Sequence, residues 1–153
     1  MRKHDDFDCQ GAASVTHRHR IAFYETDAMG IVHHSNYLRF FERARVDWLA
    51  EHDQPYTAYV EGGLHFATTR VEVDYRRSIV FDETVEITTW MESVRAASLC
   101  MAYRVEVAGE LKAVGRTEHA SVSLDGKVRR LPKDRRLHLQ GLSRRLATSE
   151  TLP

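Results

Sequence analysis

The sequence has few cysteines and no net charge. Cys9 and Cys100 are the only two cysteines in 153 residues, and no Cys-x-x-Cys pattern is present. Two cysteines cannot build a disulfide framework, which favours a reducing, cytoplasmic location. The 22 basic and 22 acidic side chains cancel. No overall charge therefore attracts the protein to nucleic acid or to a membrane surface.

The sequence also lacks any apolar run near the ~20 residues that a membrane-spanning helix needs. Its first residues lack the apolar core of a signal peptide, and we expect no membrane span. Hydrophobic residues make up 42% and charged residues 29% of the chain, as in ordinary soluble globular proteins. A chain of 153 residues is the size of one domain with a substantial core.

The spacing of apolar residues predicts one long amphipathic helix from Tyr37 to Ala50. At about 100° per residue, apolar side chains fall on one stripe, and they are Tyr37, Phe40, Phe41, Ala44 and Trp48. Charged residues occupy the other faces, so we expect the stripe to be buried. Ser35 or Asn36 is expected to cap the helix, because either side-chain oxygen can accept a free N–H of the first turn.

After this helix the pattern changes to the alternation of apolar and polar side chains that is typical of β-strands. Three stretches alternate in this way, at residues 70–76, 85–88 and 97–107. Residues 111–124 form a last predicted strand with mixed facing, and residues 15–23 form a further one. Short links join the last four stretches, so we expect an antiparallel meander. One strand, one long helix and four strands predict an α+β fold with a sheet of about five strands.

The loop before the predicted helix carries an isolated acid, a glycine and two adjacent histidines. Asp27 precedes Asn36 by nine residues, and Gly30 between them permits the chain to fold back. The free N–H groups and partial positive charge at a helix start bind anions or polarise carbonyl groups. A carboxylate beside such a site is the pairing that acyl transfer to water requires. We therefore expect acyl-transfer chemistry in this loop.

This region resembles the 4-hydroxybenzoyl-CoA thioesterase family in two runs, TDAMGIVHHSNY at residues 26–37 and FERAR at residues 41–45. The bacterial short-chain acyl-CoA thioesterase branch is the most similar one. The resemblance implies a hotdog fold, in which a curved antiparallel sheet wraps around one long helix. It also implies a homodimer or homotetramer with active sites at the subunit interface. No metal or redox cofactor is implied.

The resemblance assigns the catalytic aspartate to Asp27. It places at His34 the backbone N–H that polarises the thioester carbonyl, and the His34 side chain is a second candidate. The other candidates for the oxyanion and substrate site are His33, Asn36, Tyr37, Gly62 and Gly63. The two glycines either form a turn that needs positive φ or bring one N–H close to a ligand. Asp27 is either a general base or a nucleophile.

Two groups of arginines are candidates for binding the phosphates of coenzyme A, since such groups need paired cations. Arg76 and Arg77 follow a predicted strand, and Arg130 lies in a basic segment that begins at Lys127. The alternative for that segment is a solvated tail. The expected organisation is a mobile segment at residues 1–14, a hotdog thioesterase domain at residues 15–135 and a basic tail at residues 136–153.

The sequence therefore predicts a thioester hydrolase that converts a short-chain or aromatic acyl-CoA to free acid and coenzyme A. The alternatives are a hotdog protein that binds acyl-CoA without cleaving it and a thioesterase that acts on acyl carrier protein. Glu42 is a second candidate acid, because another hotdog branch carries its acid on the helix; a surface ion pair is the alternative for it. His17 and His19 share a strand face, but no carboxylate or cysteine completes a metal site.

Overall fold

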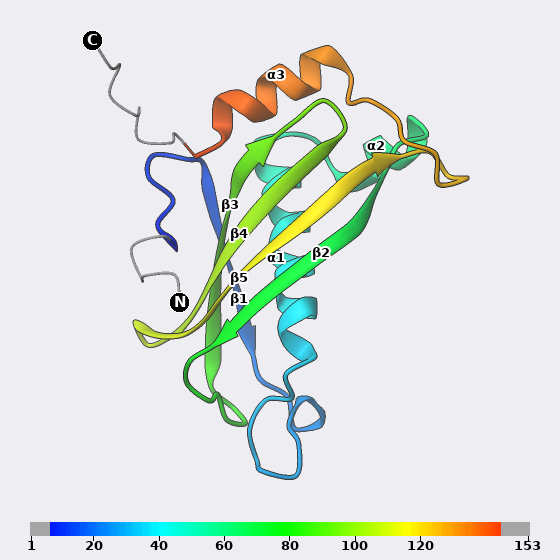
Figure 1. Cartoon of the computed structure of the whole chain (residues 1–153). Coiled ribbons are helices and arrows are strands. Elements are labelled where there is room, and N and C mark those ends of the chain that lie inside the picture. Colours follow the sequence, from blue (N-terminus) through cyan, green and yellow to red (C-terminus); the bar gives the residue numbers. More distant parts are fainter. Residues whose placement is uncertain (1–6, 145–153) are drawn as a thin grey trace.

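The structure, a computed structural model, describes residues 7–144 (Figure 1). In chain order the elements are β1 (Ser14–Arg20), the short 3₁₀ helix η2 (Phe23–Glu25), α1 (Asn36–His52), α2 (Tyr56–Glu61), β2 (His65–Tyr75), β3 (Thr84–Val94), β4 (Ser98–Val107), β5 (Glu110–Val122) and α3 (Lys133–Leu142). The predicted long helix is confirmed as α1. Over residues 7–144, no helix is long and apolar enough to cross a membrane.

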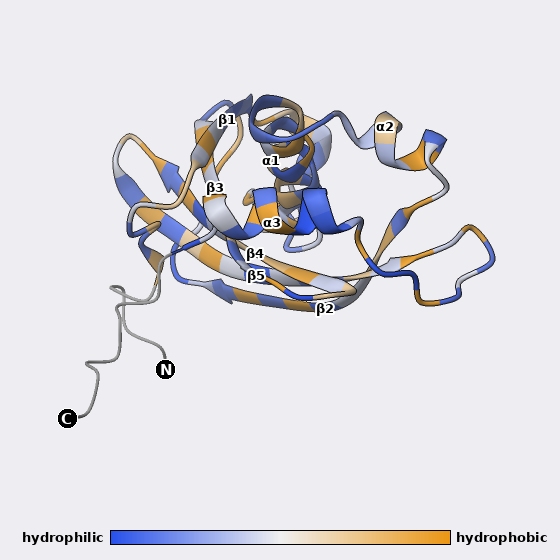
Figure 2. Ribbon diagram, turned by 90° about the horizontal axis from the view of Figure 1, so that it is seen from above, coloured by the Kyte–Doolittle hydropathy of each residue, from blue (hydrophilic) through white to orange (hydrophobic). Residues whose placement is uncertain are grey.

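The strands form one five-stranded antiparallel sheet in the order β1-β3-β4-β5-β2. The sheet curves, and α1 lies against its concave side (Figures 1 and 2). Alternating side chains explain the arrangement, because every second residue of β4 faces α1 and the residues between them face outward. The α+β architecture of a curved sheet around one long helix is therefore confirmed.

The predicted meander of four strands is wrong in one respect. Only β3, β4 and β5 follow one another across the sheet, whereas β2 pairs with β5 and forms one edge. The link between β2 and β3 must therefore cross the end of the sheet, and it is held there by backbone pairing with the loop before α1. Val32 N–H donates to Ile79 O at 2.8 Å, and Ile31 pairs with Val80. This link brings the end of β2 beside the loop that carries Asp27.

The core lies between α1 and the concave face of the sheet. All five residues of the predicted stripe are buried, each with at most 3% of its surface exposed. The Phe41 ring stacks on the Tyr103 ring of β4 at a centroid distance of 4.2 Å. Burial of such large apolar side chains is the main favourable term in folding. The contact fixes how closely α1 approaches the sheet.

That close approach depends on Gly115 in β5. A Cβ atom at this position would lie 2.6 Å from Phe41 Cε2 and 2.8 Å from the backbone oxygen of Glu72. The ring and the neighbouring strand therefore occupy the space that any larger residue would need.

We expect Gly115→Ala to lower the free energy of unfolding by about 1–3 kcal/mol, because overpacking displaces the ring or the strand. Gly141→Ala is the control, since Gly141 lies in α3, where an added Cβ atom would meet nothing within 4 Å, and alanine favours a helix. Urea unfolding of both variants measures the effect. Equal stability of the two variants would contradict the close-packing account.

The segments at both ends of the described chain pack on the domain. Residues 7–13 belong to the segment predicted to be mobile, yet Phe7 is buried in a cluster with Trp90 and Val114, and the Arg116 guanidinium lies 4.2 Å from the Phe7 ring centroid. The expected solvated tail is likewise a helix, α3, whose Leu139 is fully buried. Residues 1–6 and 145–153, the rest of those two predictions, lie outside the described residues.

Candidate active site

The predicted reactive loop closes into a tight turn that presents Asp27. Asp27 N–H donates to Ile31 O at 2.8 Å, and Gly30 N–H donates to Asp27 O at 2.9 Å. Gly30 has φ of +76°, a conformation that glycine adopts without steric cost. Met29 N–H donates to Asp27 Oδ1 at 2.8 Å. Among residues 7–144, Asp27 Oδ2 has no hydrogen-bond or ion-pair partner, so one carboxylate oxygen is oriented and the other can accept a proton.

Glu25 ties this turn to the rest of the domain, and sequence reasoning missed it. Its side chain is buried, and Oε1 accepts the Ala22 N–H at 2.7 Å and lies 2.7 Å from His19 Nε2. Its backbone oxygen accepts the His33 N–H at 2.8 Å and Asn36 Nδ2 at 2.8 Å. The Glu25 side chain therefore contacts β1 and the residue that precedes η2, and its backbone oxygen contacts the loop before α1 and the first residue of that helix. The sequence carries no signal for this role, because only contacts formed in the folded loop distinguish Glu25 from the other acidic residues.

The predicted side-chain cap of α1 is wrong. Ser35 is the N-cap residue but makes no side-chain capping bond, because its Oγ lies 2.7 Å from His33 Nδ1 instead. Asn36 is buried, and its side-chain amide donates a hydrogen bond to Glu25 O. Asn36 and His33, both predicted to contact substrate, therefore serve here to hold the loop.

His34 keeps the backbone donor that its predicted role requires. Among residues 7–144, its N–H has no hydrogen-bond acceptor, while its carbonyl accepts the Tyr75 O–H at 2.8 Å. The His34 ring stacks on the His33 ring at a centroid distance of 4.1 Å. The peptide next to the free N–H is therefore held by the end of β2. Tyr75 is a site residue that the sequence did not suggest, because only the β2 edge position brings it to the loop.

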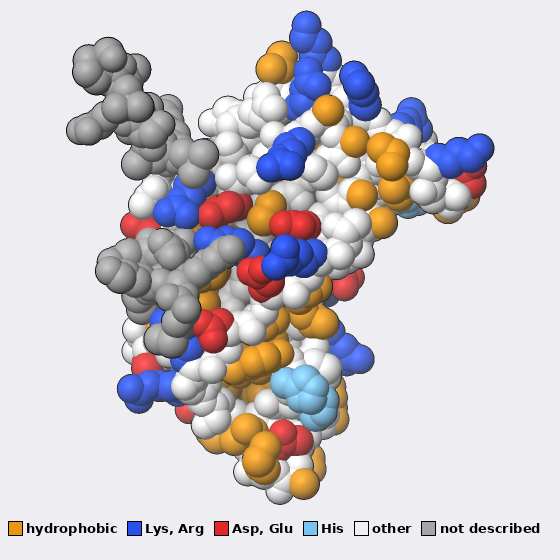
Figure 3. Space-filling view, viewed as in Figure 1, with side chains coloured by type: hydrophobic (Ala, Val, Ile, Leu, Met, Phe, Trp, Pro, Cys, Tyr) orange, Lys and Arg blue, Asp and Glu red, His pale blue; other side chains and the backbone are white. Residues whose placement is uncertain are grey.

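These groups line one cavity of about 270 Å³ at the start of α1. Its lining residues are Asp27, Met29, Ile31, Val32, His34, Tyr37, Tyr75, Arg76, Arg77 and Ser78. The Tyr37 ring lies edge-on to the Tyr75 ring at a centroid distance of 4.9 Å, and burial raises the pKa of Tyr37 to about 12. Tyr37 is therefore a protonated wall of the cavity at neutral pH. In the view of Figure 3, histidine, acidic and hydrophobic side chains gather at this end of the molecule.

Arg76 and Arg77 are brought to the same cavity, as their predicted role requires. Arg76 Nη2 lies 3.4 Å from Asp74 Oδ2 and Arg77 Nη1 lies 3.0 Å from Glu110 Oε1. In the first pair the Asp74 side chain is exposed, and in the second both Arg77 and Glu110 are exposed. Exposed ion pairs contribute little stability. Both guanidinium groups can therefore exchange these partners for a phosphate.

Gly62, Gly63 and Arg130 lie at the other end of β2 from Asp27. A strand as long as β2 spans about 30 Å, so one chain cannot bring the two ends together. Gly62 N–H donates to Ala58 O at 3.1 Å and Gly63 N–H donates to Val60 O at 2.9 Å. The prediction that one of these N–H groups points at a ligand is therefore wrong. The turn reading is correct for Gly63, whose φ is +76°.

The expected surface ion pair of Glu42 is absent among residues 7–144; this side chain lines a second cavity, farther along α1. His17 and His19 face different carboxylates, since His17 Nδ1 lies 2.7 Å from Asp47 Oδ2 and His19 contacts Glu25. No cluster of three or more His, Cys, Asp or Glu suited to a metal occurs within the described part of the chain.

The loop geometry makes a prediction about Asn36. Asn36→Asp keeps the shape but turns a buried donor into a carboxylate that faces Glu25 O. We expect it to cost about 3 kcal/mol or more of unfolding free energy at pH 7. Asn36→Ala, which only deletes the donor, should cost about 1 kcal/mol. Chemical unfolding of both variants tests the order, and the reverse order would contradict a donor role for this amide.

Comparisons with known proteins show the family of this chain. The family model described as the thioesterase-like superfamily matches residues 21–142. A protein of Aquifex aeolicus named putative esterase is 34% identical over 118 residues, which are 77% of this chain and 91% of that protein. The acyl-CoA thioester hydrolase YbgC of Escherichia coli is 32% identical over 117 residues, 74% of this chain and 87% of the relative. A crystal structure of a hypothetical protein from Thermus thermophilus superposes with a TM-score of 0.80 at 33% identity, over 85% of this chain and 98% of that chain.

Proposed function

Because the chain belongs to the thioesterase-like superfamily and is a thioester hydrolase, we propose that it hydrolyses an acyl-CoA at the cavity beside Asp27. One observation carries the assignment of the site. Asp27 Oδ2 and the His34 N–H, both without a partner among residues 7–144, belong to residues that line one cavity at the start of α1. The 4-hydroxybenzoyl-CoA branch and the short-chain branch remain predictions, and so do the cytoplasmic location and the absence of a cofactor.

The reaction follows from these two groups. In one route Asp27 takes a proton from water as the water oxygen bonds to the thioester carbon. In the other route Asp27 itself bonds to that carbon, and water then cleaves the resulting anhydride. In both routes the carbonyl oxygen gains negative charge, which the His34 N–H and the positive end of α1 stabilise. In the first route the carbon–sulfur bond breaks after water has added, and in the second route it breaks as the anhydride forms, before water attacks. In both routes the coenzyme A thiolate leaves and takes up a proton that water supplies.

Tyr75 acts as a positioning residue in this proposal. Its hydroxyl holds the His34 carbonyl, which restricts rotation of the peptide that follows the free N–H. A fixed donor stabilises an oxyanion better than a mobile one, because no reorganisation is needed as the charge develops. Arg76 and Arg77, which line the same cavity, are the candidates for binding the phosphates of coenzyme A.

We further propose that the working enzyme is at least a dimer formed through the edge strand β2. Within the described part of one chain, β2 is hydrogen-bonded to β5 on one side only. Val73 packs against the core. Val71 and Tyr75 lie two residues away on either side and therefore on the same face of β2, yet they are 40% and 48% exposed. An open edge with an uncovered apolar face is suited to a second copy of the chain.

A two-fold antiparallel pairing of β2 strands would place the start of one strand beside the end of the other. Arg130 and the Gly62–Gly63 turn of one chain would then lie near the Asp27 cavity of its partner. The exposed apolar residues around the reactive loop, Phe23, Tyr24, Met29 and Phe81, suit a further contact in a tetramer.

The first prediction from this proposal concerns Asp27. Asp27→Asn keeps the shape and the Met29 contact but removes the charge, and we expect turnover to fall by roughly 10²-fold or more with folding intact. Glu51→Gln, an exposed position on α1, is the matched control and should leave turnover unchanged. Thiol release from a panel of acyl-CoAs, run with acyl carrier protein substrates in competition, measures both variants. Full activity of Asp27→Asn would overturn the site assignment.

The second prediction concerns assembly. Sedimentation over a wide concentration range, beside the thiol-release assay, should find activity per chain disappearing as dilution dissociates the dimer or tetramer. A stable monomer of 17.6 kDa with full activity would refute the shared-interface model, while the role of Asp27 would survive.

A further inference from the structure

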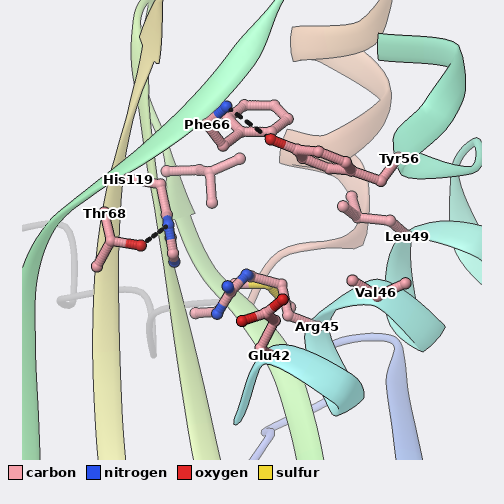
Figure 4. A pocket seen from close by; sticks show the side chains of 10 residues that line it. Glu42, Arg45, Val46, Leu49, Tyr56, Phe66, Thr68 and His119 are labelled. Atoms are coloured by element: carbon pink, nitrogen blue, oxygen red, sulfur yellow. Dashed lines mark hydrogen bonds between the residues drawn. The ribbon is translucent and has the colours of Figure 1, made fainter. Parts of the chain in front are cut away.

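A second cavity of about 270 Å³ lies between α1 and the sheet. Four aliphatic side chains, Val46, Leu49, Leu99 and Met101, form much of its lining together with the rings of Tyr56 and Phe66. The polar lining residues are Glu42 and Arg45 from α1, Thr68 from β2 and His119 from β5. Figure 4 shows Glu42 and Arg45 extending from α1 toward the sheet side of the cavity, where Thr68 and His119 lie. The cavity is thus apolar with one polar end.

A chain of hydrogen bonds beneath this polar end has only one consistent direction. Arg45 Nη1 donates to the fully buried Tyr103 hydroxyl at 3.1 Å. Because arginine cannot accept a bond, the Tyr103 proton must go to Thr117 Oγ1, 2.7 Å away. Thr117 then donates its own proton to His119 Nε2, also at 2.7 Å.

The remaining proton positions follow from that direction. With Nε2 accepting, the neutral His119 ring carries its proton on Nδ1 and donates it to Thr68 Oγ1 at 3.2 Å. The Thr68 hydroxyl proton is then left to donate to a ligand. Burial, with the Arg45 charge as a smaller cause, lowers the pKa of His119 to about 3. The sheet side of the cavity therefore presents neutral groups at physiological pH.

The helix side presents one cation and one anion that are not paired with each other. Glu42 and Arg45 lie three residues apart on α1, yet among residues 7–144 neither forms an ion pair, and the Glu42 side chain makes no hydrogen bond there. Arg45 spends one N–H on Tyr103 and has further donors. A single ligand group that both accepts and donates hydrogen bonds can satisfy the two side chains together.

We propose that this cavity binds an acyl tail that is apolar along its length and ends in a neutral hydroxyl or carboxamide group. Such an end accepts from Arg45 and Thr68 and donates to Glu42, while the aliphatic and aromatic walls cover the chain. A carboxylate end would face the Glu42 charge, and an ammonium end would face the Arg45 charge, so both are disfavoured. The link to an acyl tail rests on the proposed thioesterase function and on the proposed β2 dimer, in which the thioester would lie at the Asp27 cavity of the partner chain, since the two cavities of one chain share no lining residue. The preference of the cavity itself rests on neither.

Four five-carbon probes that differ only at one end test the cavity directly: 1-pentanol, pentanamide, pentylammonium and pentanoate. Each is titrated into the full chain, and the methyl signals of Leu99 and Met101 report binding by NMR. We expect the two neutral probes to bind about tenfold or more tightly than either ion. Tightest binding of an ion, or no shift of these methyl signals by any probe, would overturn the inference.

Variants that remove one charge should change the affinity for one probe selectively, which a purely structural role of Glu42 or Arg45 would not do. Glu42→Gln should tighten pentanoate binding selectively, and Arg45→Gln should tighten pentylammonium binding selectively, each by about tenfold. Glu51→Gln, on the same helix but outside the cavity, should leave all four affinities unchanged. If the order of the four probe affinities were the same in both cavity variants as in the unmodified protein, the proposal that Glu42 and Arg45 select the end group would be refuted.

Matched thioesters then test the link to substrate. We expect kcat/KM for 6-hydroxyhexanoyl-CoA to exceed the values for adipoyl-CoA and 6-aminohexanoyl-CoA by about tenfold or more. Equal values for the three would overturn the acyl-tail assignment. Probe binding needs no turnover, so the absence of thiol release from every acyl-CoA would refute the proposed function and remain distinct from failure of the cavity to bind neutral probes.

Discussion

The stacking of Phe41 on Tyr103 above Gly115 sets the distance between α1 and the sheet, and both cavities depend on that distance. The stacked rings lie near the middle of the domain, with the Asp27 cavity toward the start of α1 and the Glu42 cavity farther along the helix. Interiors are packed closely enough that a shift of the helix would be felt at both ends. One hydrophobic contact therefore positions both the reactive loop and the polar end of the second cavity.

Features that depend on periodicity were predictable from the sequence. The stripe from Tyr37 to Trp48 repeats at helical spacing and is buried as expected, and the alternation in β4 identified its inward face. The place of β2 at the sheet edge was not predictable, because alternation gives a strand its faces but not its neighbours. The error about the meander and the missed role of Tyr75 have this common origin.

The same distinction holds within the site. Asp27 and Gly30 could be proposed from the residues themselves, because a turn and a helix start are local features, whereas His34 was proposed from the family resemblance. Glu25 could not be identified, since its value lies in contacts to Ala22, His33 and Asn36 that form only when the loop closes. The Gly62–Gly63 dipeptide shows the opposite error: its local pattern suited two readings, and the hydrogen bonds of α2 decide for the turn.

The central claim is that the thioester carbonyl lies between Asp27 and the His34 N–H. A crystal structure with a 2-oxoalkyl-CoA, in which a methylene group separates the ketone from sulfur and prevents hydrolysis, tests it most directly. The account predicts the ketone oxygen about 3 Å from the His34 nitrogen, with the carbonyl carbon facing Asp27 Oδ2. A ketone bound away from both groups, or with its oxygen held by another donor while His34 N–H stays unpaired, would contradict it.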